Sequence, residues 1–133
     1  MEWLRISTST EMVRVATDEI VYVRADGNYS DLVLTNGKRR KMTFQLNYFD
    51  NAFHNLQNNT FVRVGRSLIV NTRYIYVINL TEQQLILSGG HMKEEIVFYG
   101  QTKFDQPKDI CLSRDALKQL KELLETEKWV YNG

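Results

Sequence analysis

The sequence predicts a mainly β protein, with antiparallel sheets, one internal helix and one C-terminal helix. Three observations support this fold class. Most of the 133 residues fall into short runs in which apolar and polar side chains alternate, as they do along a half-buried strand. Turns rich in glycine and asparagine separate neighbouring runs. Only two segments place apolar residues at helical spacing.

The first half of the chain reads as a series of hairpins. The opening pair of strands, residues 3–8 and 12–15, is joined by the turn S-T-S-T-E. A mostly apolar run at 20–25 and a strand at 29–35 flank the turn Asp26-Gly27-Asn28. Asn36-Gly37 is a strong signal for a two-residue hairpin loop, so residues 38–43 are expected to form the returning strand.

The spacing then changes from that of a strand to that of a helix. Thr43 is a suitable N-cap for a helix over residues 44–56, which carries apolar residues at Leu46, Phe49, Phe53 and Leu56. Strands are expected again at 61–64, 67–70, 74–78 and 84–87. A second helix is predicted over residues 113–127, with Ser113 as its cap. Its apolar stripe consists of Ala116, Leu117, Leu120, Leu123 and Leu124.

Length and composition fit one globular domain spanning residues 1–133. The chain is 43% hydrophobic and 25% charged, and it lacks both a membrane-spanning apolar run and a secretory leader. We therefore expect a cytoplasmic protein without a membrane partner. The single cysteine, Cys111, excludes an intrachain disulfide, and its apolar neighbours favour a buried hydrophobic role.

Positive charge is concentrated in the middle of the chain. Residues 24–73 contain eight Lys or Arg and three Asp, a balance of 8 − 3 = +5, whereas the whole chain carries +1. The remainder therefore sums to −4. A basic middle on a nearly neutral chain is the pattern expected if one face meets phosphate.

The most informative stretch runs from Phe61 to Asn71 and reads F-V-R-V-G-R-S-L-I-V-N. Arg63 falls between apolar positions, on the opposite face of the strand. Gly65 interrupts the alternation and allows a bend just before Arg66 and Ser67. A planar guanidinium on such a bend is suited to binding phosphate or the edge of a guanine.

Together with its flanks, this stretch resembles the LytTR-type DNA-binding domain, a module common in bacterial response regulators of two-component systems. The matching segments are D-E-I-V-Y-V with G-N-Y, the stretch at 61–71, and S-R before an apolar helix. They cover residues 18–120 and begin near the start of the chain, so we expect a stand-alone module. The resemblance implies a cytoplasmic transcription regulator that binds double-stranded DNA, with loops reaching successive major grooves and repeated sites as targets.

Carried over by position, three loops supply the expected DNA contacts. The first loop consists of Asn28, Tyr29 and Ser30. The second consists of Gly65, Arg66 and Ser67 and contains the expected base reader, Arg66, which can form paired hydrogen bonds with guanine O6 and N7. The third is the entry to the last helix, at Ser113, Arg114 and Asp115. The complete set of expected DNA-binding residues is Asn28, Tyr29, Ser30, Lys38, Arg39, Arg40, Lys41, Arg63, Arg66, Ser67 and Arg114. Arg63 and the basic run at 38–41 are expected to contact phosphate.

Residues 88–109 depart from the family pattern, which has a short turn at this place. The segment includes E-E-I-V-F-Y and the only proline, Pro107, and we expect an extra hairpin or a long loop. Its mixed charges offer no basic patch. We therefore expect it to lie away from the DNA.

Other function classes are weakly supported. Neither His54 nor His91 has a Cys or His at metal-ligand spacing, and no nucleotide-binding or catalytic motif occurs, so we expect no enzyme, metal or cofactor. Single-stranded nucleic acid could stack on tyrosines, and these are Tyr29, Tyr48, Tyr74, Tyr76 and Tyr99. Family members often carry histidine where this chain has Gly65. The main alternative is thus a LytTR-like module that binds a protein partner, with weak or lost DNA binding.

Overall fold

The computed structural model of the protein describes residues 2–57, 59–100 and 112–126. In this part of the chain, ten strands form three antiparallel sheets and are joined by two α-helices, which confirms the predicted mainly β class. The strands are β1 (Trp3–Ser7), β2 (Met12–Ala16), β3 (Ile20–Asp26), β4 (Tyr29–Leu34), β5 (Arg39–Met42), β6 (Phe61–Val64), β7 (Leu68–Asn71), β8 (Ile75–Asn79), β9 (Gln84–Leu87) and β10 (Ile96–Tyr99). The helices are α1 (Leu46–His54) and α2 (Arg114–Glu125), with 3-10 turns η1 (Thr17–Glu19) and η2 (Thr72–Tyr74).

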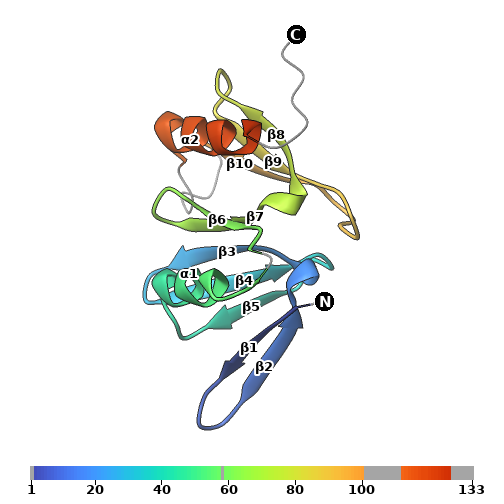
Figure 1. The fold of residues 1–133 in the computed structure, drawn as a ribbon, viewed down its shortest axis with the longest axis vertical. Coiled ribbons are helices and arrows are strands. Elements are labelled where there is room, and N and C mark those ends of the chain that lie inside the picture. The colour runs from blue at the N-terminus through green and yellow to red at the C-terminus, as the bar shows by residue number, and fades with distance from the viewer. Residues whose placement is uncertain (1, 58, 101–111, 127–133) are drawn as a thin grey trace.

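The three sheets follow one another along the long axis of the molecule (Figure 1). The β1–β2 hairpin occupies one end, and the sheet β10-β9-β8 lies with α2 at the other end. Between them is the five-stranded sheet β5-β4-β3-β7-β6, with α1 on one of its faces. Every paired strand is antiparallel to its neighbour, so short turns connect most of them.

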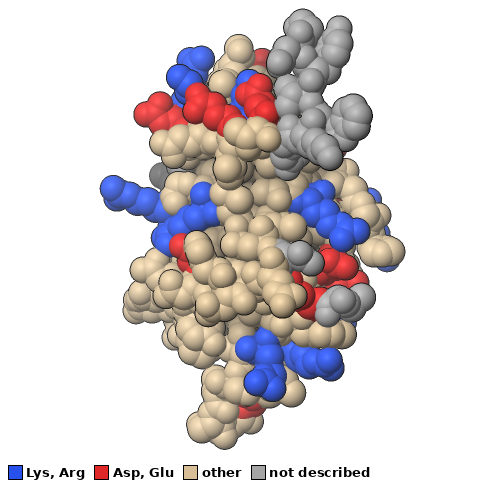
Figure 2. Space-filling view, viewed as in Figure 1, with Lys and Arg blue, Asp and Glu red and all other residues tan. Residues whose placement is uncertain are grey.

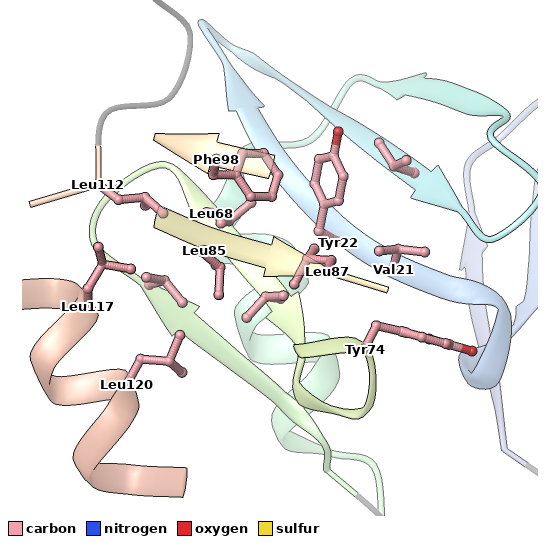
Figure 3. Close-up of a cluster of buried hydrophobic side chains, with 13 residues drawn as sticks. Val21, Tyr22, Leu68, Tyr74, Leu85, Leu87, Phe98, Leu112, Leu117 and Leu120 are labelled. Atoms are coloured by element: carbon pink, nitrogen blue, oxygen red, sulfur yellow. The ribbon is translucent and has the colours of Figure 1, made fainter. Parts of the chain in front are cut away.

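The five-stranded sheet separates two hydrophobic cores. A bulge at Val21 changes the alternation of β3, so that Val21 and Tyr22 both face the β8–β10 side while Ile20 and Val23 face α1. Figure 3 shows Leu117 and Leu120 pointing from α2 into the first of these cores. Each large side chain that is fully buried in this way stabilises the fold by about 1.5–3 kcal/mol.

Asn71 is a buried polar side chain at the junction between the middle sheet and the β8–β10 sheet. Its carbonyl oxygen accepts from the Thr60 hydroxyl at 2.8 Å and from the Arg73 amide at 3.1 Å. Its amide nitrogen donates to the carbonyl of Ile20 at 2.9 Å. Tyr74, buried alongside, donates its hydroxyl hydrogen to the carbonyl of Asp18. These bonds fix the path of the chain from β7 into β8.

The internal helix is shorter than the sequence predicts. It begins at Leu46, and Gln45 occupies the N-cap position without a side-chain capping bond, so the prediction that Thr43 caps the helix is wrong. The reason lies at Phe44, whose carbonyl accepts a hydrogen bond from the buried Ser30 hydroxyl at 2.8 Å. Because that carbonyl is held by β4, residues 43–45 remain an irregular connection outside the helix.

The second helix begins as predicted, since Ser113 accepts a capping bond from the Ala116 amide at 3.1 Å. Of residues 88–109, for which the sequence left an extra hairpin or a long loop open, the described part contains one strand, β10, which pairs with β9. It belongs to the core, because Phe98 packs edge-on against Tyr22 with ring centroids 5.0 Å apart. Residues 101–109, Pro107 and Cys111 lie outside the described residues. Neither described helix is long and apolar enough to cross a membrane.

Candidate nucleic-acid interface

Two of the three predicted loops are neighbours at one end of the five-stranded sheet. In the register of β3 with β7, Arg24 lies opposite Leu68, and the Ala25 amide donates to the Ser67 carbonyl at 2.8 Å. The β3–β4 turn and the β6–β7 turn therefore emerge side by side. Gly27 and Gly65 have φ angles of +60° and +63°, a left-handed conformation that favours glycine in both turns.

The third predicted loop lies against the second. A Cβ atom built on Gly65 would be 3.9 Å from the Cβ of Ala116, which is in the first turn of α2. The start of α2 thus lies beside the β6–β7 turn, close enough that one added methyl group would touch it, although the two are far apart in the sequence. Figure 1 shows both at the left edge of the molecule, together with the β3–β4 turn.

Arg66 has the properties of a residue that meets an external partner. It is exposed on the β6–β7 turn, and its guanidinium makes no hydrogen bond or ion pair with any residue that the structure describes. Figure 2 shows Lys and Arg side chains projecting at the height of this turn. Ser67, the next residue, is half-buried and begins the return into β7.

Arg63, which the sequence assigns to phosphate, occupies a different environment from Arg66, because its guanidinium makes bonds within the protein. Its guanidinium donates to the Asn47 side-chain oxygen and lies 3.7 Å from the Asp50 carboxylate, both on α1. It also donates to the carbonyl of Arg66 at 3.1 Å. Arg63 therefore ties α1 to the turn that presents Arg66, and both of its terminal nitrogens are engaged within the protein.

The first loop presents two exposed side chains. Asn28 lies at the tip, and its side-chain oxygen is 3.4 Å from the amide nitrogen of Gln45. Tyr29 is 46% exposed, with the Lys41 ammonium 5.8 Å from its ring centre. Ser30 differs from the sequence-based assignment. It is fully buried and holds Phe44, so its hydroxyl is not available to DNA.

The basic run at 38–41 does not form one surface. Arg40 reaches Glu11 on the β1–β2 turn at 2.7 Å, whereas Lys41 bonds to Asp26 and lies 3.6 Å from Asp31. The hydrogen bond from Lys41 lowers the pKa of Asp26, and the same bond raises the pKa of Lys41. Since alternate residues of a strand face opposite sides, the two ion pairs lie on opposite faces of β5.

Lys38 and Arg39 lie at the far end of the sheet from the loops. The Leu34 amide donates to the Lys38 carbonyl at 3.0 Å, which places Lys38 level with the end of β4. Tyr29 begins β4, five residues away, and at about 3.3 Å per residue the separation is about 17 Å. The arrangement thus separates Lys38 and Arg39, both exposed, from the turn that carries Arg66.

Arg114 lies at the first position of α2 and is exposed, with no bonded partner among the described residues. Together with the loops above, it completes a row of candidate residues at one edge of the molecule, all of them exposed except the half-buried Ser67. This row consists of Asn28, Tyr29, Arg66, Ser67 and Arg114. We call it the loop edge.

Sequence reasoning missed Gln45 as a neighbour of the loop edge. Its side chain is exposed and contacts Asn28. The predicted helix covered residues 44–56, so Gln45 was expected within a helix and not beside a DNA-binding loop. The only sequence signal was the absence of a favourable cap residue at this position.

The remaining function classes find little support in the geometry. The tyrosines do not form a stacking platform, since Tyr74 is buried and Tyr48 stacks on Phe44 at a centroid distance of 4.2 Å. Among the described residues, no three His, Cys, Asp or Glu side chains are grouped so that they could hold a metal ion.

Comparisons with known proteins agree with the fold and the resemblance. The family model for the LytTr DNA-binding domain matches residues 10–125. Among solved structures, the chain is similar to the LytTr DNA-binding domain of a protein described as a methyl-accepting/DNA response regulator from Bacillus cereus. That match has a TM-score of 0.58 and 19% identity, and it covers 93% of this chain and 97% of the other. A comparison with curated proteins finds no match. On the family match over residues 10–125, this chain belongs to the LytTR family of DNA-binding domains, which serve in transcription regulation.

Proposed function

We propose that this domain recognises specific sequences in double-stranded DNA and regulates transcription through that binding. The loop edge would enter successive major grooves. The observation that carries the proposal is the exposed Arg66, which has no bonded partner among the described residues and lies on a turn that is bonded to Ala25 of β3 and lies beside Ala116 of α2. A guanidinium carried on such a turn can form paired hydrogen bonds with guanine, each such pair being worth about 1–3 kcal/mol of discrimination.

The remaining roles follow from exposure and pairing. Asn28, Tyr29 and Arg114 are exposed at the same edge and would contact bases or phosphates beside the site read by Arg66. Ser67 would contact the sugar-phosphate backbone of the DNA. Arg63 would act as a positioning residue, because it holds the Arg66 carbonyl and two side chains of α1.

The basic run at 38–41 would contribute less to DNA binding than its charge alone indicates. Lys41 is close enough to the first loop to reach a phosphate, but Asp26 and Asp31 already offset much of its charge. Arg40 is paired with Glu11, and Lys38 and Arg39 lie at the far end of β4. We therefore propose that Lys38, Arg39 and Arg40 lie outside the main DNA contact.

Binding would involve repeated sites. We propose that the domain is a monomer in free solution at micromolar concentration and that two copies associate on adjacent sites. Sites separated by one or two helical turns, each about 34–36 Å, would keep both copies on one face of the duplex. A stable dimer in sedimentation experiments without DNA would contradict this part of the proposal.

The decisive experiment is selection of bound sequences from a pool of random duplexes, followed by affinity measurements at several salt concentrations. We expect an enriched motif containing guanine and a steep loss of affinity with salt, because each phosphate contact contributes about −0.9 to the logarithmic slope. A domain that only bound a protein partner would enrich no motif. The absence of enrichment, with weak and salt-independent binding to all duplexes, would reject the proposal.

A further inference from the structure

The β1–β2 hairpin carries two arginines that oppose each other without a counter-charge. Arg5 and Arg14 are direct cross-strand partners, and both side chains are exposed. Neither makes an ion pair or hydrogen bond with any described residue, in contrast to Arg24, Arg40 and Lys41, which all have acidic partners. Like charges directly opposite each other destabilise a strand pair. The hairpin thus retains an arrangement that does not serve its own stability.

An exposed tryptophan orients one of these arginines. The Arg14 guanidinium lies 3.9 Å from the centre of the Trp3 ring, and Trp3 is 44% exposed. At this distance the ring face attracts the guanidinium and restrains it, while its N–H groups make no hydrogen bond with any described residue. Two such donors side by side are a suitable receptor for carboxylates.

A groove beside the arginines provides apolar surface. It has a volume of about 470 Å³ and lies between the hairpin and the second half of α1. Its lining consists of Trp3, Leu4, Arg5, Arg14, Ala52, Asn55 and Leu56. One wall is therefore basic and aromatic, while Ala52 and Leu56, which are both half-buried, supply apolar contacts and Leu4 lies buried beneath them. Figure 2 shows basic side chains gathered over the hairpin, below α1.

We propose that this groove binds an acidic segment of a protein partner, with carboxylates at Arg5 and Arg14 and an apolar side chain against Leu56. Charge complementarity identifies the partner's chemistry. The apolar lining favours a peptide over a DNA backbone, because phosphates and sugars have little to place there. None of the lining residues belongs to the loop edge, so the domain could hold DNA and the partner at the same time.

The test measures fluorescence anisotropy with a labelled peptide of alternating acidic and apolar residues, three repeats of Asp-Leu-Glu-Phe. A peptide with Asn and Gln in place of the acids is the control ligand. Saturable binding of the acidic peptide, at least about tenfold tighter than the amide peptide, is expected from paired arginine–carboxylate bonds. Absence of saturable binding, or equal affinity for the two peptides, would overturn the proposal.

The informative variant is Arg5→Glu, which places opposite charges across the hairpin. It should raise the melting temperature, because repulsion with Arg14 becomes attraction. It should also lower the affinity for the acidic peptide by at least about tenfold. Arg73→Ala removes an exposed arginine elsewhere, beside Asp18, and should leave peptide affinity unchanged. An Arg5→Glu protein that is folded and still binds the peptide as tightly as wild type would contradict the assignment.

Duplex binding in the same variant separates this inference from the DNA-binding proposal. Arg5→Glu should keep its affinity for the selected duplex within about threefold, since the hairpin is remote from the loop edge. A loss of duplex binding as large as the loss of peptide binding would show that the arginines contact the DNA backbone, and it would overturn the peptide site.

Discussion

Replacing Arg63 with alanine distinguishes a positioning residue from a phosphate contact. The side chain is 31% exposed and binds Asn47, the Arg66 carbonyl and, at 3.7 Å, Asp50. Hydrogen bonds to a charged group contribute about 1.5–3 kcal/mol when buried. Because a third of this side chain meets solvent, we expect Arg63→Ala to lower the free energy of unfolding by about 1–2 kcal/mol. Urea denaturation measures this loss.

The effect on DNA binding should appear as lost discrimination. Without Arg63 the backbone of the β6–β7 turn loses its bond to Arg63 and thereby its link to α1, so Arg66 is presented less precisely and affinity for the preferred duplex falls by about 1–3 kcal/mol. Affinity for a scrambled duplex should change little, and the salt slope should stay the same. Competition assays with both duplexes at two salt concentrations measure these quantities. Arg73→Ala serves as a control for the loss of one exposed positive charge.

A double-mutant cycle makes the test strict. If Arg63 acts through Arg66, then Arg63→Ala should have little further effect on DNA binding in an Arg66→Ala background, so the coupling energy should approach the whole loss of about 1–3 kcal/mol that Arg63→Ala causes alone. A phosphate contact predicts additive losses, equal weakening of both duplexes and a salt slope smaller by about one unit. That second pattern would refute the positioning role.

Three further predictions each concern a single kind of side chain. Arg66→Ala should cost about 1–3 kcal/mol on the preferred duplex and relax the preference at one base position, as measured by competition, whereas equal losses on all duplexes would demote Arg66 to a phosphate contact. Asn71→Ala should lower the free energy of unfolding by about 2–4 kcal/mol, because several buried donors and acceptors lose their partner at once; a change below about 1 kcal/mol in denaturant titration would contradict this account. Burial raises the pKa of Tyr22 and Tyr74 above the ordinary 10.0. Stability should therefore be complete below pH 10 and fall as the pH rises further, and Tyr74→Phe should make the decline shallower in unfolding curves between about pH 9 and 11.

Local sequence patterns predicted the fold well where one face of an element is buried. The alternation in β6 and β7, the Asn36-Gly37 turn and the Ser113 cap all appear where the sequence places them. The start of α1 was missed because a contact from another strand decides it. No local pattern around Phe44 indicates that Ser30 will bind its carbonyl.

The candidate interface was predictable only in part, for a related reason. The exposed turn of Arg66 follows from Gly65 and the flanking alternation, and the structure places it as expected. Charge counts cannot show pairing, however. Glu11 and Asp31 are distant in sequence from the cations that they contact or approach, so the basic run looked like one surface although its charges are divided between two. The engagement of Arg63 by α1 likewise depends on tertiary contacts.

The contact between the β6–β7 turn and the start of α2 bears on the thermodynamics of binding. Because Gly65 approaches Ala116 closely and Ser67 is bonded to β3, these two loops hold their mutual arrangement before any ligand arrives. The conformational entropy of these loops is lost when the protein folds, so binding to DNA does not require them to lose it again. The heat capacity change of binding should therefore match the surface that DNA covers, without the additional burial that accompanies a segment folding on its target.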